Sequence, residues 1–270
     1  MSVKVDQLSE PGEYDDAMLT LLQVIWGDGF LSPGGAPELA RLLEGSEIAG
    51  CSVLDIGCGL GAIDALLVTD YGARSVVGID IDPALIASMN TRIARAGLAD
   101  RVEGKAVGGG ALPFPANSFD VVFSKDAIVQ IPDKAAMFAE VLRVLRPGGR
   151  FIASDWLRGG TGPYSPAMLE FFRLEGITYN MATLAESAAS LRAVGFTTVD
   201  IRDRHAWYRE LAHQELAAME GPLKEVITAR IGQQRTAHFI EDWRQLVLVV
   251  DRGELRPGHL KASKPESPIR

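Results

Sequence analysis

Short apolar runs alternate with segments of helical periodicity through residues 50–155. The runs end in glycine or polar residues, which is the pattern of buried strands. We expect strands at 52–56, 75–79, about 101–107, 119–124 and 150–155, with helices between them at 62–69, 83–96 and 133–145. Strands and helices that alternate in this way predict a parallel sheet with right-handed crossovers.

The pattern continues on both sides of this core. Before it we expect an amphipathic helix at 14–26, a glycine-rich loop at 27–35 and a second helix at 36–44. After it we expect helical segments at about 165–175, 183–193 and 206–231, and late strands at 197–202 and 246–253. The prediction is therefore a Rossmann-like, doubly wound α/β fold whose seven-stranded sheet is mostly parallel.

This pattern also suggests a domain organisation. We expect residues 1–45 to form an N-terminal helical lid and residues 46–260 to form the main domain. Within the main domain, 156–195 is expected to be an inserted helical cap on the side where a substrate, the acceptor of a transferred group, would bind. The polar tail at 261–270 is expected to be disordered.

The run V-L-D-I-G-C-G-L-G at 53–61 carries most of the functional information. A strand stops at three glycines and a helix follows, so the backbone can turn tightly against a ligand. A second strand ends in Asp80, which is placed to hydrogen-bond a ribose diol. Asp55 beside the loop would repel a pyrophosphate but suits a cation. S-adenosylmethionine is therefore favoured, with a dinucleotide as the main rival and an ordinary glycine turn as the simplest alternative.

Composition excludes several classes of function. The chain has 270 residues, of which 47% are hydrophobic and 23% charged, as in globular proteins. A net charge of −8 argues against a nucleic-acid partner. No apolar window reaches the roughly 18–20 residues that span a bilayer, and the first residues lack an apolar signal core. With two cysteines and no convincing metal-ligand spacing, we expect a cytoplasmic protein without a metal.

Four motifs in order resemble the class I S-adenosylmethionine-dependent methyltransferases. They are L-D-I-G-C-G-L-G, G-I-D-I-D, L-P-F-P-A-N-S-F-D-V-V-F-S and L-R-P-G-G-R-F, within about 50–155. A dehydrogenase shares the glycines and Asp80 but is not expected to carry the last two motifs. The resemblance implies S-adenosylmethionine as cofactor and a small-molecule acceptor as partner, for a monomer or a homodimer.

The resemblance also implies site residues. The cofactor would be held by Asp55, Gly57, Cys58, Gly59, Gly61, Asp80, Ile81, Ser124 and backbone near Gly108. Ser124 and Asp126 would line the opening through which the methyl group passes. Simpler alternatives are a helix cap for Asp126 and a turn residue for Ser124.

Segments outside the core resemble the phosphoethanolamine N-methyltransferases, with the sarcosine and dimethylglycine methyltransferases as neighbours. They are W-G-D-G-F-L-S-P-G-G at 26–35, S-K-D-A-I-V-Q-I at 124–131 and S-D-W at 154–156. In that family a tyrosine and a histidine orient the amine and take its proton. We place these positions at Phe30 and Gln130, and neither residue can act as a base. This departure puts phosphoethanolamine itself in doubt as the acceptor.

The predicted activity is methyl transfer to a small molecule, most simply to an amine nitrogen. A neutral tertiary amine or a thioether needs no base, and Phe30, Trp156 and Trp26 could face the developing positive charge. Core packing is the alternative for these aromatic residues. Thioether S-methylation, O-methylation of a natural product and non-catalytic cofactor binding stay open.

Two further sets of polar residues are weaker candidates. Tyr164, Arg173, Tyr179 and Asn180 are polar candidates in the expected cap, although an isolated arginine is more often in a surface ion pair. His205, His213 and His238 are alternative bases, although surface or structural roles are commoner for such residues.

Overall fold

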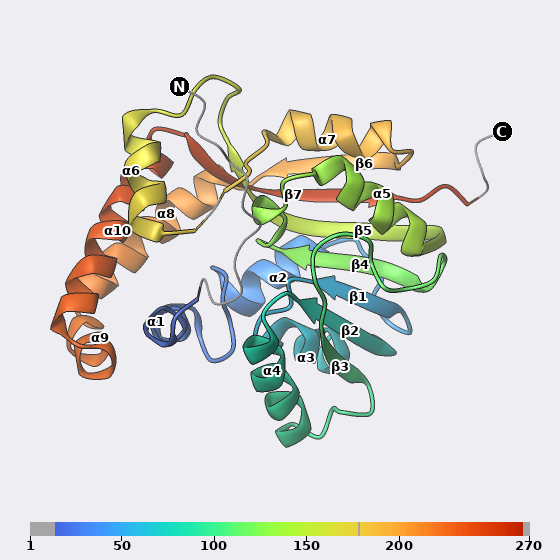
Figure 1. Cartoon of the computed structure of the whole chain (residues 1–270), viewed down its shortest axis with the longest axis horizontal. Coiled ribbons are helices and arrows are strands. Elements are labelled where there is room, and N and C mark those ends of the chain that lie inside the picture. Colours follow the sequence, from blue (N-terminus) through green and yellow to red (C-terminus); the bar gives the residue numbers. More distant parts are fainter. Residues whose placement is uncertain (1–13, 178, 267–270) are drawn as a thin grey trace.

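The computed structural model describes residues 14–177 and 179–266, and its centre is one seven-stranded sheet (Figure 1). The strands are β1 (Ser52–Ile56), β2 (Ser75–Asp80), β3 (Val102–Ala106), β4 (Phe119–Lys125), β5 (Leu145–Arg158), β6 (Thr197–Asp203) and β7 (Leu255–Ser263). Their order is β3-β2-β1-β4-β5-β7-β6, and only β7 runs antiparallel to its neighbours. The predicted mostly parallel α/β fold is confirmed.

Helices cover both faces of the sheet. One face carries α2 (Gly35–Leu43), α3 (Ala62–Thr69) and α4 (Pro83–Arg95), and the other carries α5 (Lys134–Val144) and α7 (Leu184–Ala193). Each face has its own apolar cluster, in which strand residues alternate between the two sides. Val53 packs with α2, α3 and α4, whereas the next residue, Leu54, packs with α5 and α7. This alternation follows from the period of two in a strand.

The remaining helices form a separate layer beside the sheet (Figure 1). They are α1 (Asp16–Trp26), α6 (Pro166–Glu175), α8 (His205–Glu220), α9 (Lys224–Ile231) and α10 (Gln233–Asp251). These helices share a third apolar cluster, in which α10 packs against α6 and α8, and α1 packs against α9. The N-terminal segment is thus joined to helices almost two hundred positions later in the sequence.

The strand predicted at 246–253 is wrong, because these residues belong mostly to α10. The run L-V-L-V-V favours a strand by composition, but four of its five side chains pack into the helical layer and only Leu248 is exposed. Tertiary packing overrides the β-propensity here. The true last strand, β7, contains Pro257 and Gly258, which disguise it in the sequence.

Three other boundaries differ from expectation. The helix predicted at 206–231 is broken at Gly221 into α8 and α9, and the helix at 233–251 was not foreseen. Most of the helical cap comes from 205–251, between β6 and β7, whereas 156–195 supplies only α6 to it. The predicted disordered tail begins too early, because β7 continues to Ser263. Residues 267–270 and residues 1–13 of the predicted lid lie outside the described residues.

Candidate functional site

The glycines of the 53–61 run form a tight loop between β1 and α3. Gly57, Gly59 and Gly61 have φ of +78°, +54° and +78°, which side-chain-bearing residues rarely adopt. A Cβ on Gly57 would lie 2.2 Å from the Cβ of Ala127, and one on Gly61 would lie 2.6 Å from Met89 Cγ. The loop therefore requires glycine for both backbone conformation and packing.

Asp80 connects the glycine loop to the end of β2. Its Oδ2 accepts a hydrogen bond from the Gly59 amide at 3.0 Å, and its Oδ1 accepts one from the Asp82 amide at 3.0 Å. A carboxylate has further acceptor sites, so the predicted contact with a ribose diol remains compatible with these bonds. The next residue, Ile81, is 40% exposed, which leaves an apolar side chain available to an adenine ring.

A pair of carboxyl groups lies beneath the loop. Asp55 and Asp64 are 2% and 0% exposed, and no described cation pairs with either. Burial raises the pKa of both carboxyl groups, to about 7 for Asp64. Each carboxyl group also influences the pKa of the other. A positive charge in the loop above would be stabilised by ionisation of this pair, whereas a pyrophosphate would be repelled. These residues and the side-chain-free loop fit S-adenosylmethionine.

Three other predicted cofactor residues occupy different environments. Cys58 is partly buried with its Sγ 3.3 Å from Met89 Sδ, and burial raises the pKa of its thiol. Gly108 is exposed, and a Cβ there would meet nothing within 4 Å. Ser124 is fully buried, and its hydroxyl donates to the Ile56 carbonyl at 2.7 Å. The Ser124 side chain thus ties β4 to β1 and is not a lining residue of the pocket at this end of the sheet.

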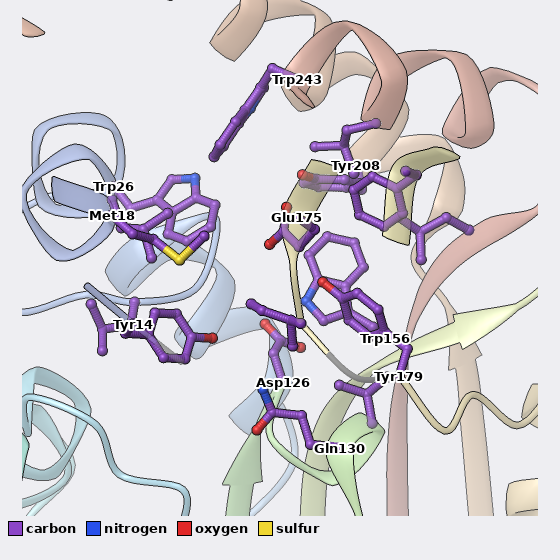
Figure 2. Close-up of a pocket in the computed structure, with 17 residues that line it drawn as sticks. Tyr14, Met18, Trp26, Asp126, Gln130, Trp156, Glu175, Tyr179, Tyr208 and Trp243 are labelled. Carbon is purple, nitrogen blue, oxygen red and sulfur yellow. The ribbon is translucent and has the colours of Figure 1, made fainter. Parts of the chain in front are cut away.

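A pocket of about 60 Å³ lies between the end of the sheet and the helical layer (Figure 2). Its walls come from both termini of the described chain. The lining residues are Tyr14, Met18, Leu22, Trp26, Leu31, Asp126, Val129, Gln130, Trp156, Phe171, Glu175, Ile177, Tyr179, Tyr208, Trp243, Leu246 and Leu255. Of the predicted catalytic residues, the structure brings together Asp126, Gln130 and Trp156. Phe30 and Ser124 are not among the lining residues.

Asp126 is held rigidly at the end of β4. Its Oδ1 accepts from the Ser154 hydroxyl and its Oδ2 from Lys125 Nζ, each at 2.8 Å. The side chains of Asp126 and Lys125 are 6% and 3% exposed. Asp126 also has a φ of +60°, an unusual value for a residue with a Cβ that is found preferentially at functional sites.

The alternative of a helix cap at Asp126 lacks support. The short helix η1 (Ile128–Gln130) that follows β4 has no side-chain cap. The buried Asp155 instead accepts from the Val129 amide at 2.8 Å. Asp126 is therefore available to the pocket, where its carboxyl group and the Gln130 amide are drawn on the same side in Figure 2.

Two tryptophans of the pocket wall are joined by one carboxyl group. Trp26 Nε1 on α1 donates to Glu215 Oε1 at 2.7 Å, and Trp243 Nε1 on α10 donates to Glu215 Oε2 at 3.2 Å. Glu215 is 5% exposed, and burial raises its pKa to about 7. This group fixes the position of the N-terminal helix against the helical layer.

Glu175 brings a second acidic group into the pocket. It is the last residue of α6. Its carboxyl group forms hydrogen bonds with the carboxyl group of Asp242 and with the hydroxyl of Tyr179. Asp242 is 1% exposed, and burial together with Glu175 raises its pKa to about 10. Burial also raises the pKa of Glu175. Because two buried carboxylates in contact repel each other, Glu175 and Asp242 are stabilised by a proton shared between them.

Sequence reasoning missed Tyr14, Glu175 and Trp243. Phe30 packs near Gly27, whereas Tyr14 lines the pocket and directs its hydroxyl toward the side where Asp126 lies (Figure 2). The available signal was the position of Tyr14 directly before Asp15, which caps α1 by accepting from the Met18 amide at 2.8 Å. No comparable local signal marks Glu175 or Trp243.

The polar cap residues and the histidines, which were the weaker candidates from the sequence, lie at several separate places in the structure. Arg173 is exposed and pairs with Glu170 at 2.6 Å, and the Tyr164 ring lies 4.1 Å below the Arg158 guanidinium. Asn180 donates to the Gln130 carbonyl at 3.2 Å, and this bond ties residues 179–183 to η1. Tyr179 lines the pocket, but His205, His213 and His238 do not.

The described residues offer neither a metal-ligand cluster nor a helix that could cross a membrane. Residues 14–177 and 179–266 contain no group of three or more His, Cys, Asp or Glu side chains arranged to hold a metal ion. Among the helices of these same ranges, none has the length and apolar character needed to cross a membrane.

Comparison with known proteins agrees with this geometry. Residues 54–153 match the family described as "Methyltransferase domain". Phosphoethanolamine N-methyltransferase 1 of Arabidopsis thaliana is 30% identical over 217 residues, which cover 80% of this chain and 43% of that protein. The chain spans about half the length of the first curated relatives it matches.

Solved structures show the same fold. Phosphoethanolamine N-methyltransferase 2 of Haemonchus contortus, in complex with phosphomonomethylethanolamine and S-adenosylhomocysteine, has a TM-score of 0.86 and 25% identity over 94% of this chain and 59% of that chain. A putative sarcosine dimethylglycine methyltransferase from Galdieria sulphuraria has a TM-score of 0.78 and 21% identity, covering 95% and 99% of the two chains. The class I methyltransferase interpretation of the sequence is confirmed.

Proposed function

We propose that this chain, which carries a class I S-adenosylmethionine-dependent methyltransferase domain, methylates the nitrogen of a small amine. The observation that carries the proposal is the pocket beside β4, where aromatic rings and two acidic side chains surround a small space. Aromatic faces and carboxylates both stabilise a positive charge on nitrogen. The names of the relatives support an amine as the acceptor.

The methyl donor is S-adenosylmethionine, which supplies a methyl carbon activated by the adjacent sulfonium. We propose that the loop at Gly57, Gly59 and Gly61 holds its methionine and ribose portions, with Asp80 on the ribose hydroxyls and Ile81 against adenine. Leu31 packs over Gly59, since a Cβ there would lie 3.0 Å from Leu31 Cδ1. Leu31 also lines the acceptor pocket, so the N-terminal segment borders both sites.

When bound, S-adenosylmethionine would supply the methyl carbon to the lone pair of the acceptor nitrogen, while its sulfur would keep the electron pair of the broken bond. The methylated nitrogen would then carry a positive charge. Asp126, fixed by Ser154 and Lys125, orients the amine, and its carboxylate stabilises the new charge. Positioning of this kind accounts for a large part of the rate in displacement reactions.

A primary or secondary amine must also lose a proton. Gln130 is a neutral amide and cannot accept it. Asp126 and Glu175 are the carboxyl groups that line the pocket, and Tyr14 is the phenol directed toward Asp126. We propose that Tyr14, rather than Phe30, occupies the place of the tyrosine in the phosphoethanolamine enzymes. A tertiary amine would need no proton acceptor at all.

The test is a turnover assay with purified chain, S-adenosylmethionine and a panel of primary to tertiary amines, thioethers and phenols, with release of S-adenosylhomocysteine as the readout. Methylation of amines with little or no activity on the other two classes supports the proposal. Preference for a thioether or a phenol would replace it with S- or O-methylation. Calorimetric binding of the cofactor without turnover of any compound would favour a non-catalytic binding protein.

A further inference from the structure

We propose that the methyl acceptor of this chain carries no phosphate or carboxylate, and that its end opposite the methylated nitrogen donates a hydrogen bond to Glu175. This inference rests on the proposed function, because it specifies the acceptor of the same N-methylation. It concerns the part of the pocket that Glu175 lines.

The charged side chains of the pocket wall are acidic. Among the described lining residues two are acidic, and none is lysine, arginine or histidine. The nearby Lys125 is engaged with Asp126 Oδ2 at 2.8 Å and with the Pro33 carbonyl at 3.1 Å. Arg158 lies over the Tyr164 ring, which is not part of the lining. An anionic group in this pocket would therefore lose its hydration without gaining a cation.

The Glu175 carboxyl group lies among polar groups that leave it able to accept a further hydrogen bond. The Asp242 carboxyl group and the Tyr179 hydroxyl both form hydrogen bonds with the carboxyl group of Glu175. His238, on α10, interacts with it electrostatically and opposes the rise of its pKa. As the last residue of α6, Glu175 also lies at the negative end of a helix dipole. A carboxyl group that is hydrogen-bonded to two partners, here Asp242 and Tyr179, still has acceptor sites left. A hydroxyl or ammonium group fits this remaining place, whereas a phosphate oxygen is repelled.

The main experiment compares acceptors that differ only in the far group. Ethanolamine is matched with phosphoethanolamine, and dimethylethanolamine with dimethylglycine, by release of S-adenosylhomocysteine. We expect kcat/KM to be about 100-fold higher for the uncharged member of each pair, because a like-charge contact costs several kcal/mol. Equal or higher kcat/KM for phosphoethanolamine or dimethylglycine would overturn the inference while supporting the proposed function.

Two more amines test the hydrogen-bond donor. Propylamine replaces the hydroxyl of ethanolamine by a methyl group, and we expect about tenfold lower kcat/KM. Ethylenediamine distinguishes a second ammonium from a hydroxyl as the preferred donor. If the kcat/KM of propylamine equals those of ethanolamine and ethylenediamine, the proposed hydrogen bond from the acceptor to Glu175 is overturned. If no amine is methylated, the proposed function fails, and calorimetry with S-adenosylhomocysteine then decides whether ethanolamine still binds more tightly than phosphoethanolamine.

A variant assigns the selectivity to Glu175. Glu175→Gln should reduce the preference for ethanolamine over phosphoethanolamine about tenfold, because it removes the negative charge while keeping the shape. Glu170→Gln is the matched control on the same helix, since Glu170 pairs with Arg173 outside the pocket, and it should leave the ratio unchanged. Should Glu175→Gln fail to fold, Asp242→Asn is measured instead. An unchanged ratio in a folded variant would overturn the role of Glu175.

Discussion

The proposed cofactor side and the proposed acceptor side of this molecule are built in different ways. The cofactor side takes its main residues from two short stretches, 53–61 and 80–82, at the ends of neighbouring parallel strands. The acceptor side takes residues from α1, η1, β5, α6, α8 and α10, which are spread from Tyr14 to Leu255. The first site is specified by local backbone geometry, and the second exists only when the helical layer is assembled.

The largest expected effect is on the cofactor side, with Gly57→Ala. The new Cβ would overlap Ala127 at 2.2 Å on a backbone with φ of +78°. We expect folding to be destabilised by roughly 2–4 kcal/mol and cofactor binding to be lost. Thermal unfolding and calorimetry with S-adenosylmethionine measure the two effects. Gly160→Ala, with no atom within 4 Å of its Cβ, is the control, and equal behaviour of the two variants would contradict the geometry.

The second prediction concerns Asp126 on the acceptor side. Asp126→Asn removes the charge that pairs with Lys125 and orients the amine. We expect kcat to fall by roughly 10²–10³, as for loss of a group that stabilises developing charge. Calorimetric affinity for S-adenosylmethionine should stay within a few-fold. The control is Asp200→Asn on the exposed surface of β6. A large loss of cofactor affinity would mean that the two sides are not separable.

The third prediction distinguishes Tyr14 from Phe30. Tyr14→Phe removes a hydroxyl directed into the pocket, and kcat/KM should fall about tenfold, the worth of one hydrogen bond. Phe30→Leu keeps an apolar side chain outside the lining and should change kcat/KM by less than about twofold. Steady-state kinetics with the best amine measures both. A larger effect at Phe30 would restore the interpretation made from the sequence.

The smallest effect is expected on the pH dependence of stability, through Glu215. In the unfolded chain this carboxyl ionises near pH 4.5, whereas burial in the folded chain keeps its proton up to about pH 7. The folded state therefore binds more protons between these values, and its free energy of unfolding falls as the pH rises through this window. The slope from one group is at most about 1.4 kcal/mol per pH unit.

Glu215→Gln should remove this contribution, although the amide loses one of the two tryptophan hydrogen bonds. Urea unfolding between pH 4.5 and pH 7 should give a shallower slope for the variant than for the unmodified chain. Glu220→Gln, on the exposed end of the same helix, should keep the original slope. Identical slopes for all three proteins would show that Glu215 is not linked to folding.

Much of the sheet was predictable because each strand has a local signature. The strands β1 to β4 fall close to their expected ranges, since each is a short apolar run between helical segments. The last strand was misplaced because two signals conflict there. The run at 246–250 has the composition of a strand but lies in α10, and the true strand contains Pro257 and Gly258.

The choice between Phe30 and Tyr14 shows the same limit in the site. Both are aromatic residues of the N-terminal segment, and the resemblance in the sequence led to Phe30 as the partner of Gln130. Only the packing of α1 against α9 and the bond from Trp26 to Glu215 determine which ring lines the pocket. Glu175 was missed because a glutamate at a helix end is ordinarily a solvent-exposed residue.

The sequence by itself determined the fold class and the glycine loop of the proposed cofactor site, because glycine conformation, strand ends and helix starts depend on neighbours within a few residues. The loop at 53–61 and the strand end at Asp80 follow from the local order of residues. Tertiary structure alone decided the proposed acceptor pocket. Its charge and size depend on contacts such as those of Glu175 with Asp242 and of Glu215 with two tryptophans, which join residues far apart in the chain. Such contacts form only when separate helices bury their apolar faces together, and no local pattern encodes their register.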